Sequence, residues 1–281
     1  MFAGISRIYF IGKGNFQMSF FRGEICTKTL CFMLAFIAFI MFLVVYFIKP
    51  GINFLIVLFL FMLFYGLIGR HTNGRYLGIL INDRNVMSLS RFQVAAWTAV
   101  VLSAYIVIAT TRAINCIPDS LDIDMDYRVW IMMGISVTSL IATPHILANK
   151  EEKQFDESTQ SAKMAVAEKL TQVCNNLNAE DIVNNSKGLL FANKLPKTAE
   201  FTDIFEGDEI SNACSVDIAK LQMFFFTMVA LVTYSINLFY LIKTNPITAN
   251  FPTLSEGFLV ILGISYGGYV SSKTITNTKI Q

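Results

Sequence analysis

Long runs of apolar residues alternate with short polar stretches along this chain of 281 residues. A helix that crosses the roughly 30 Å hydrocarbon layer of a bilayer needs about 20 predominantly apolar residues. Six runs approach or meet this length, and none of them contains Asp, Glu, Lys or Arg. Their spacing along the chain groups them in pairs, which predicts three helical hairpins. The six expected spans are Leu30–Ile48, Ile52–Gly69, Phe92–Thr111, Val129–Ala148, Leu221–Ile242 and Gly257–Ser272.

This pattern predicts an all-α integral membrane protein with six transmembrane helices arranged as three hairpins. The composition agrees, because 54% of the residues are hydrophobic and only 15% are charged, against roughly 25% charged residues in an ordinary soluble domain. Too little polar surface remains to cover a soluble globular enzyme. We expect a cytoplasmic segment at 1–29, hairpins at 30–69, 88–148 and 217–273, a cytoplasmic insertion at 149–216 and a cytoplasmic tail at 274–281.

The distribution of Lys and Arg predicts the orientation of the chain. The segments on the same side as the N-terminus hold 18 of the 22 basic residues, and the segments on the opposite side hold four. Basic residues concentrate in the cytoplasmic loops of membrane proteins, so we expect both termini in the cytoplasm. The net charge of +2 is too small to suggest nucleic-acid binding.

Two of the hairpins form an internal repeat, in which residues 88–105 match residues 217–234. The following helix keeps the same offset, because Gly134-Ile135-Ser136 aligns with Gly263-Ile264-Ser265. Both copies cross the membrane in the same direction, which predicts a parallel repeat about an axis along the membrane normal. The aligned polar pairs are Arg91 with Lys220, Gln93 with Gln222 and Thr98 with Thr227.

The repeated glutamines and glycines have a structural and a functional interpretation. Each glutamine lies just inside a span, where an unpaired amide is costly, so we expect Gln93 and Gln222 to hydrogen-bond between helices. A symmetric polar site on the axis is the alternative. Gly134, Gly263 and Gly267 are spaced for close helix packing within or between subunits, and a pore lined by small residues is the alternative there.

Three blocks of the chain resemble a group of bacterial multi-pass inner-membrane proteins that has no assigned activity. The first block, Ser88–Thr98, follows the pattern S-L-S-R-x-Q-x-x-x-W-T. The second, Phe201–Thr227, contains G-D-E-x-x-N and D-x-x-K-x-Q-x-F-F-F-T, and the third is the closing hairpin at Phe251–Lys273. The resemblance implies a protein of the bacterial inner (plasma) membrane and assigns no catalytic residue.

The predicted cytoplasmic insertion contains an amphipathic helix. Apolar residues recur there at a spacing of four, three and four, which is typical of one helix face. We expect this face to pack on its own protein, with a contact to a neighbouring subunit as the alternative. The residues of the face are Val166, Leu170, Val173 and Leu177.

A cluster of acidic residues follows this helix, shortly before the fifth span. Such a run is most often a solvated linker, although it also suits a divalent cation or a docked basic partner. The basic loop residues Arg70, Arg75 and Arg84 would pair with it as a structural clamp. The acidic residues are Asp203, Glu206, Asp208 and Glu209.

The sequence contains no complete catalytic, cofactor or metal motif. Walker A, HExxH, GxSxG and kinase signatures are missing, so we expect no enzymatic activity and no cofactor. The D-x-D-x-D run at Asp122–Asp126 lacks the glycine and glutamate of an EF-hand loop, and the five cysteines show no zinc spacing. We therefore expect free thiols and no bound metal. His145 is ionisable and lies within a span, but its position near the boundary favours a structural role.

These observations favour a non-enzymatic function. We expect copies of the chain to form an oligomeric membrane scaffold or pore, whose cytoplasmic segment receives a protein partner or a signal. Defence effectors that disrupt bacterial membranes fit this description by analogy. The main alternative is a transporter or channel for a small solute or ion, built on the parallel repeat. A lipid-modifying enzyme that uses His145 is a third hypothesis. The expected partners are the lipid bilayer, further copies of the chain and a cytoplasmic protein, with no nucleic acid.

Overall fold

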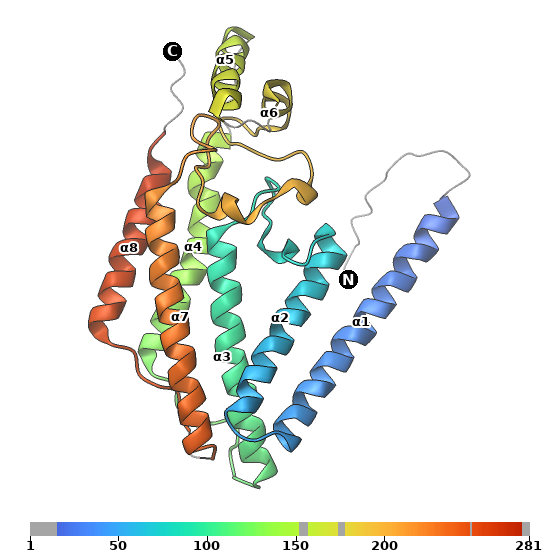
Figure 1. Cartoon of the computed structure of the whole chain (residues 1–281), viewed down its shortest axis with the longest axis vertical. Coiled ribbons are helices and arrows are strands. Elements are labelled where there is room, and N and C mark those ends of the chain that lie inside the picture. The colour runs from blue at the N-terminus through green and yellow to red at the C-terminus, as the bar shows by residue number, and fades with distance from the viewer. Residues whose placement is uncertain (1–15, 152–156, 174–177, 248, 277–281) are drawn as a thin grey trace, which may run out of the picture.

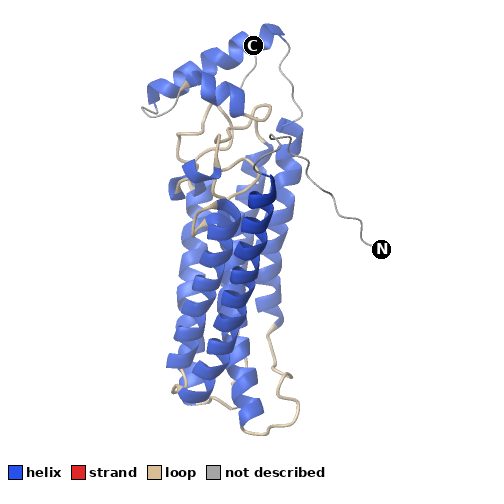
Figure 2. Ribbon diagram, turned by 90° about the vertical axis from the view of Figure 1, so that its right-hand side faces the viewer, coloured by secondary structure: helices blue, strands red, loops and turns tan. Residues whose placement is uncertain are grey.

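Helices dominate the computed structural model, which describes residues 16–151, 157–173, 178–247 and 249–276 (Figure 1). Within these residues, long helices run side by side, and short helices and loops gather at one end of them (Figure 2). We call this end the cap end and the opposite end the loop end. The long helices are α1 (Phe16–Phe47), α2 (Ile52–Asn73), α3 (Leu89–Ile114), α4 (Tyr127–Glu151), α7 (Ile218–Thr244) and α8 (Glu256–Thr274).

Five helices of the described chain are long and apolar enough to cross a membrane. They are α1 from Thr27 onwards, α2, α3, α4 and α7, and they identify a helical membrane protein. The sixth expected span corresponds to α8, which does not belong to this set. This helix has 19 residues and contains several Gly, Ser and Tyr residues, which lower its apolar character.

Helix α3 lies at the centre of the bundle. It packs against α1, α2, α4 and α7, while α8 packs against both α4 and α7. The buried share of the apolar span is 56% for α3 and only 17% for α1. The apolar core around α3 includes Trp97, Ala104 and Val107 from this helix, Phe54 from α2 and Leu238 from α7.

Large apolar side chains also cover the outer surface of the bundle. Phe32, Phe36 and Phe39 on α1 are each more than half exposed. Soluble monomers rarely expose a contiguous apolar surface of this kind. Helix α1 also diverges from α2 towards the cap end (Figure 1). Its exposed face therefore suits lipid chains or another helix.

The cap is built from short elements. Three 3-10 helices, η1 (Gly78–Leu80), η2 (Pro196–Thr198) and η3 (Phe201–Ile204), accompany α5 (Glu157–Val173) and α6 (Ala179–Asn185). The expected amphipathic helix is α5, and its Leu170 packs in a small apolar cluster with Ile182 of α6 and Ile210. Leu177 lies outside the described residues, and so does the side chain of Val173.

The cysteines differ from the expectation of free thiols. Cys31 and Cys116 are free, whereas Cys214 in the cap is disulfide-bonded. Cys174 lies outside the described residues, and so does the side chain of Cys26. A disulfide requires two cysteines to approach closely in space, which their spacing along the chain does not reveal.

At the loop end, polar contacts fix the helix ends to one another. Gly51 has a φ of 86° in the turn between α1 and α2, and a Cβ on it would lie 3.0 Å from Lys243 Cβ. Arg112 at the end of α3 donates a hydrogen bond of 3.1 Å to the carbonyl of Ile247. Arg128 at the start of α4 pairs with Glu256 at the start of α8 at 2.7 Å.

Candidate functional site

A buried carboxylate at the cap end contacts three cations that come from distant parts of the chain. Asp208 Oδ1 accepts a hydrogen bond from Arg84 Nη2 at 2.8 Å and lies 3.2 Å from Lys220 Nζ. The ammonium group of Lys273 contacts the other oxygen, Oδ2. The side chains of the three cations are only 4–6% exposed. All four charges are therefore largely removed from water.

The next residue, Glu209, pairs with a fourth cation. Its Oε1 accepts a hydrogen bond from Lys150 Nζ at 2.7 Å, and only 1% of the Glu209 side chain is exposed. Lys150 also donates to the carbonyl of Ile275, just beyond α8. We call the two carboxylates and their cations the Asp208–Glu209 clamp. Its cations are Arg84, Lys150, Lys220 and Lys273.

The clamp joins one loop of the cap to the ends of three long helices and to the loop before a fourth. Movement of this loop would therefore act on all four segments together. The cations come from the loop before α3 (Arg84), the last turn of α4 (Lys150), the first turn of α7 (Lys220) and the last turn of α8 (Lys273).

Local backbone contacts hold the loop that carries the two carboxylates. The amide of Glu209 donates to Asn212 Oδ1 at 3.0 Å, and the amide of Phe191 donates to the Asp208 carbonyl at 2.9 Å. A Cβ at Gly207 would lie 2.2 Å from Asn212 Oδ1. Glycine is therefore required beside Asp208, because any larger residue would displace the loop.

The clamp perturbs the ionisation of its central carboxylate. Burial alone would raise the pKa of the Asp208 carboxyl, but the charges of Lys220, Lys273 and Arg84 outweigh burial and hold this pKa well below its usual range. Asp208 is therefore ionised near neutral pH. Its charge faces three cations that would otherwise repel one another.

Of the other two members of the acidic cluster, Asp203 lies beside the start of α3 and Glu206 beside the start of α7. Asp203 Oδ2 accepts hydrogen bonds from the amides of Met87 and Glu200, both at 3.0 Å. Burial raises the pKa of the Asp203 carboxyl, and burial followed by the charge of Asp203 raises the pKa of Glu206. The segment expected as a solvated linker is therefore partly buried and internally bonded.

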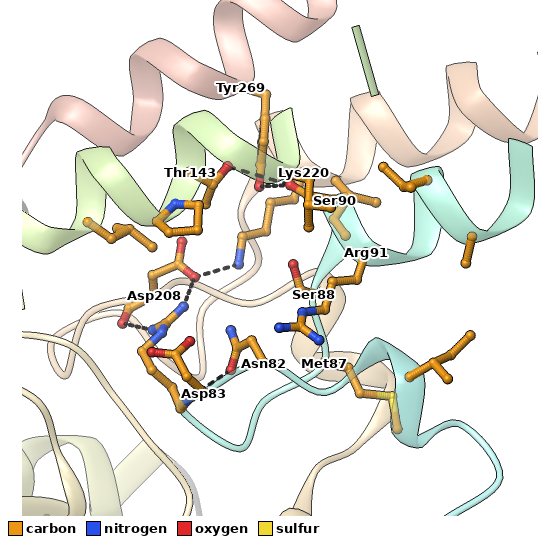
Figure 3. Close-up of a pocket in the computed structure, with 18 of the residues that line it drawn as sticks. Asn82, Asp83, Met87, Ser88, Ser90, Arg91, Thr143, Asp208, Lys220 and Tyr269 are labelled. Carbon is orange, nitrogen blue, oxygen red and sulfur yellow. Dashed lines mark hydrogen bonds and ion pairs between the residues drawn. The ribbon is translucent and has the colours of Figure 1, made fainter. Parts of the chain in front are cut away.

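A cavity of about 700 Å³ lies beside the clamp (Figure 3). Its walls come from α2, α3, α4 and the loop before α3, and Tyr269 of α8 also lines it. Three clamp residues, Arg84, Asp208 and Lys220, form part of the wall. Ligand pockets commonly have volumes of about 300–1,000 Å³, so this cavity has room for a ligand.

Arg91 extends from the first turn of α3 into the cavity (Figure 3). Its side chain is partly buried and, among the described residues, it makes no hydrogen bond or ion pair. The side chains that line the cavity include three cations, Arg84, Arg91 and Lys220, and three carboxylates, Asp83, Glu151 and Asp208. Asp208 pairs with Arg84 and Lys220, and Asp83 and Glu151 both pair with Lys187, so Arg91 is the lining cation that has no carboxylate partner.

Hydroxyl groups at one side of the cavity join three helices. Ser90 Oγ on α3 lies 2.8 Å from Ser139 Oγ on α4 and 3.3 Å from the Tyr269 hydroxyl on α8. Thr143 Oγ1 on α4 lies 3.5 Å from the same Ser90 oxygen. Because these hydroxyls satisfy one another, they form a fixed polar wall.

The glutamines of the predicted repeat have different environments. Gln93 is fully buried, and its Nε2 donates to Thr227 Oγ1 at 2.8 Å between α3 and α7. Gln222 is exposed, and Thr98 lines the cavity. Helices α3 and α7 are therefore joined by the bond between Gln93 and Thr227, and the equivalent bond between Gln222 and Thr98 does not form.

The remaining predicted positions lie on the outer surface. His145 on α4 is exposed. A Cβ at Gly134, Gly263 or Gly267 would meet no heavy atom within 4 Å, so these glycines do not mediate close packing within one chain. Within the described residues, no three His, Cys, Asp or Glu side chains group as metal ligands would.

Several residues of the cavity and the clamp escaped the sequence analysis. Lys150 and Lys273 counted there only as basic residues at span ends, and Tyr269 carried no motif. The predicted pairing of the basic loop with the acidic cluster is confirmed for Arg84 and Asp208, whereas Arg70 contacts Tyr76 and Arg75 donates to main-chain carbonyl groups. The alignment of Arg91 with Lys220 was a second signal, because it placed a cation at the same depth in both copies.

Comparison with known proteins adds no further identification. The chain matches no known family model, no curated protein and no solved structure.

Proposed function

We propose that this chain is a non-enzymatic multi-pass membrane protein, in which the cap receives a partner or signal and passes it to the helices. Several copies would together form a membrane scaffold or pore. The observation that carries the proposal is the Asp208–Glu209 clamp, because one cap loop binds cations from three helix ends and from the loop before α3. The excess of basic residues on the cap side supports a cytoplasmic cap, with both termini in the cytoplasm of a bacterial cell.

Helix α8 is proposed as the sixth span, because its two ends coincide with the ends of neighbouring spans. Glu256 near its start pairs with Arg128 of α4, and Lys273 near its end contacts Asp208 beside α7. Its 19 residues extend about 28 Å at 1.5 Å per residue, close to the thickness of the hydrocarbon layer. The proposed repeat then consists of α3 with α4, and α7 with α8.

Small residues on the outer surface support assembly of several copies. Gly263, Gly267 and Ser271 follow one another at a spacing of four on α8, and the last two are exposed. Gly134 on the neighbouring α4 is also exposed. Small residues allow helix backbones to approach closely in lipid. Because no part of the same chain covers these glycines, a second copy is the proposed neighbour.

The interior of one chain favours a scaffold, or a pore between copies, over a solute path through a single chain. The α3–α7 interface contains large buried side chains, including Trp97 and Tyr234, whose ring centroids are 6.0 Å apart. Transporters commonly place charged groups or broken helices at mid-membrane. In the described part of this chain, the buried charged side chains all belong to the clamp at the cap end.

The thiol of Cys116 gives a test of transmission from the cap to the loop end. Cys116 is free and exposed near the loop end, far along α3 from the clamp. In a Cys31→Ser background in liposomes, Asp208→Asn should change the rate of Cys116 alkylation by a water-soluble reagent. Asp181→Asn is the matched control, because Asp181 forms an exposed pair with Lys194. Equal Cys116 rates in both variants would remove the support for transmission.

Assembly is tested separately by counting subunits. Native mass spectrometry in nanodiscs should find several copies of the wild type and fewer for Gly267→Ile, with no change for Val232→Phe on the exposed face of α7. A monomeric wild type would contradict the scaffold. Selective, saturable solute uptake by liposomes that disappears in a Gln93→Leu, Gln222→Leu variant would replace the proposal with a transporter.

A further inference from the structure

The starts of α3 and α7 differ in how their positive charges are balanced. At the start of α7, the Asp217 carboxylate accepts hydrogen bonds from the amides of Ala219 and Lys220 at 3.0 and 3.2 Å. Lys220 is further neutralised by Asp208. At the start of α3, the Ser88 side chain makes no capping hydrogen bond. The Asp203 carboxylate binds the amide of Met87 just before this helix, but the corresponding cation, Arg91, has no partner among the described residues.

The Arg91 cavity has one cation available to an anionic ligand. The carboxylates that line the cavity all pair with other cations, and the unpaired cation is the one that extends into the cavity (Figure 3). The Arg91 guanidinium has no acceptor among the described residues, so its N–H groups can bind a ligand in the cavity. A phosphodiester with one negative charge would pair with this cation and accept hydrogen bonds from Arg91.

An apolar groove adjoins this polar cavity. It has a volume of about 580 Å³ and is lined by α1, α2, α3 and η1. Tyr65, Ile79 and Ala95 line both spaces, so the cavity and the groove adjoin one another at these residues. Its lining is almost entirely apolar, and it includes Ile37 of α1 and Leu67 of α2. A hydrocarbon chain would fit there, beside the polar group held by Arg91.

The position of Arg91 matches the headgroup level of a bilayer. It precedes the uncharged segment of α3, which begins at Phe92 and continues to Thr111. Basic pockets between transmembrane helices at this level are suited to lipid headgroups. A ligand with an anionic group at Arg91 and an apolar part in the groove is therefore amphiphilic, and the bilayer itself supplies such molecules.

We propose that an anionic phospholipid binds here, with its phosphate on Arg91 and an acyl chain in the groove that shares Tyr65, Ile79 and Ala95 with the cavity. The proposal goes beyond the proposed function, because a single copy of the chain contains the whole site. Free phosphate or a soluble phosphate ester shares the headgroup chemistry but lacks the acyl chain. The acyl chain is therefore what the experiment must separate from the charge.

The test uses the full chain, purified and incubated with phosphatidylglycerol or phosphatidylcholine of identical acyl chains. Native mass spectrometry counts the bound lipid on the monomer, so the result does not depend on assembly. The wild type should prefer phosphatidylglycerol, and Arg91→Gln should reduce this preference about ten-fold, as expected for loss of a charge-assisted hydrogen bond. Lys194→Gln, which removes an exposed cation of the cap, is the matched control and should leave the preference unchanged.

Further variants keep the test decisive if Arg91→Gln fails to fold. Arg91→Lys retains the charge and should retain most of the preference. Ala95→Leu places a larger side chain where the cavity and the groove adjoin. It should weaken binding of phosphatidylglycerol, because less space remains for the acyl chain, and should leave binding of glycerol phosphate unchanged. An equal lipid preference in Arg91→Gln and Lys194→Gln would overturn the proposal. Glycerol phosphate alone could protect the protein from heat as well as phosphatidylglycerol does, and equally well in Ala95→Leu. This result would overturn the proposal that the ligand is a phospholipid, and would identify it as a soluble anion.

Discussion

Removal of the charge on Asp208 is expected to destabilise the protein strongly. In Asp208→Asn, a neutral amide would face Arg84, Lys220 and Lys273, whose side chains are only 4–6% exposed. Removing one partner of a buried ion pair costs about 3–5 kcal/mol, because the remaining charge is desolvated and uncompensated. A domain of 150–250 residues loses about 2–4 °C in unfolding temperature per kcal/mol. We therefore expect the midpoint of thermal unfolding to fall by about 6–20 °C.

Circular dichroism of the helices during heating in detergent measures this change. Asp181→Asn is the matched control, because Asp181 lies 3.6 Å from Lys194 and both side chains are more than half exposed. Exposed pairs contribute about 0–1 kcal/mol, so the control should lose at most about 4 °C. If Asp208→Asn loses no more than the control, the clamp does not hold buried charges in the way described above.

The same carboxylate predicts how stability depends on acid. Its pKa is lower in the folded chain than the value of about 4 expected for an unfolded Asp. The stabilisation by Asp208 is therefore fully present above about pH 4 and is lost as the pH falls through the lower, folded pKa. Unfolding temperatures measured between pH 7 and pH 2 should fall less steeply for Asp208→Asn than for the wild type. Parallel curves for the two proteins would contradict this origin of the acid sensitivity.

Other variants separate the roles of the remaining polar groups. Glu209→Gln, which leaves its lysine without a carboxylate, should lower the free energy of unfolding by about 3–5 kcal/mol in the same heating experiment. Gln93→Leu should lower the free energy of unfolding by about 1 kcal/mol, as is typical of an interhelical hydrogen bond in a membrane. Gln222→Leu should lower it by less than about 0.5 kcal/mol, because this side chain is exposed. Equal losses would mean that both glutamines form hydrogen bonds between helices. For a reporter fused to the C-terminus, we expect activity on the cytoplasmic side of the membrane and none on the outer side. Activity on the outer side would refute the proposed cytoplasmic location of the C-terminus and the cap. It would also place the Cys214 disulfide in an oxidising compartment.

The helices were predictable because a bilayer imposes a simple requirement on the chain. Each span needs a long uncharged run, and such runs stand out locally in the sequence, as at Leu30–Ile48. Five of the six predicted spans correspond to helices that meet the length and composition of a membrane span. Helix α8 shows the limit of this argument, because its polar groups meet partners from distant parts of the chain: Tyr269 contacts Ser90 of α3, and Lys273 contacts Asp208 in the cap loop.

One pair of the clamp, Arg84 with Asp208, was predicted from the opposite charges of two cytoplasmic segments, although 124 residues separate them. The three lysines of the clamp were not predicted, because nothing near Asp208 or Glu209 in the sequence indicates that helix ends will bring these cations together. A local acidic run has the same composition whether it is solvated or buried. Gln93 and Gln222 give the same lesson, since aligned positions in similar helices are fully buried in one copy and exposed in the other.

The lipid site and the clamp share side chains, which makes their states interdependent. Arg84 and Lys220 bind Asp208 and also line the cavity into which Arg91 extends. A phosphate in the cavity would add a negative charge near these cations, so it would alter the free energy with which the cap loop is held. By thermodynamic linkage, a change in the clamp must then alter the affinity for the lipid by the same factor. A lipid of the bilayer would thus act, through Arg91, on the same helix ends on which a protein partner of the cap would act.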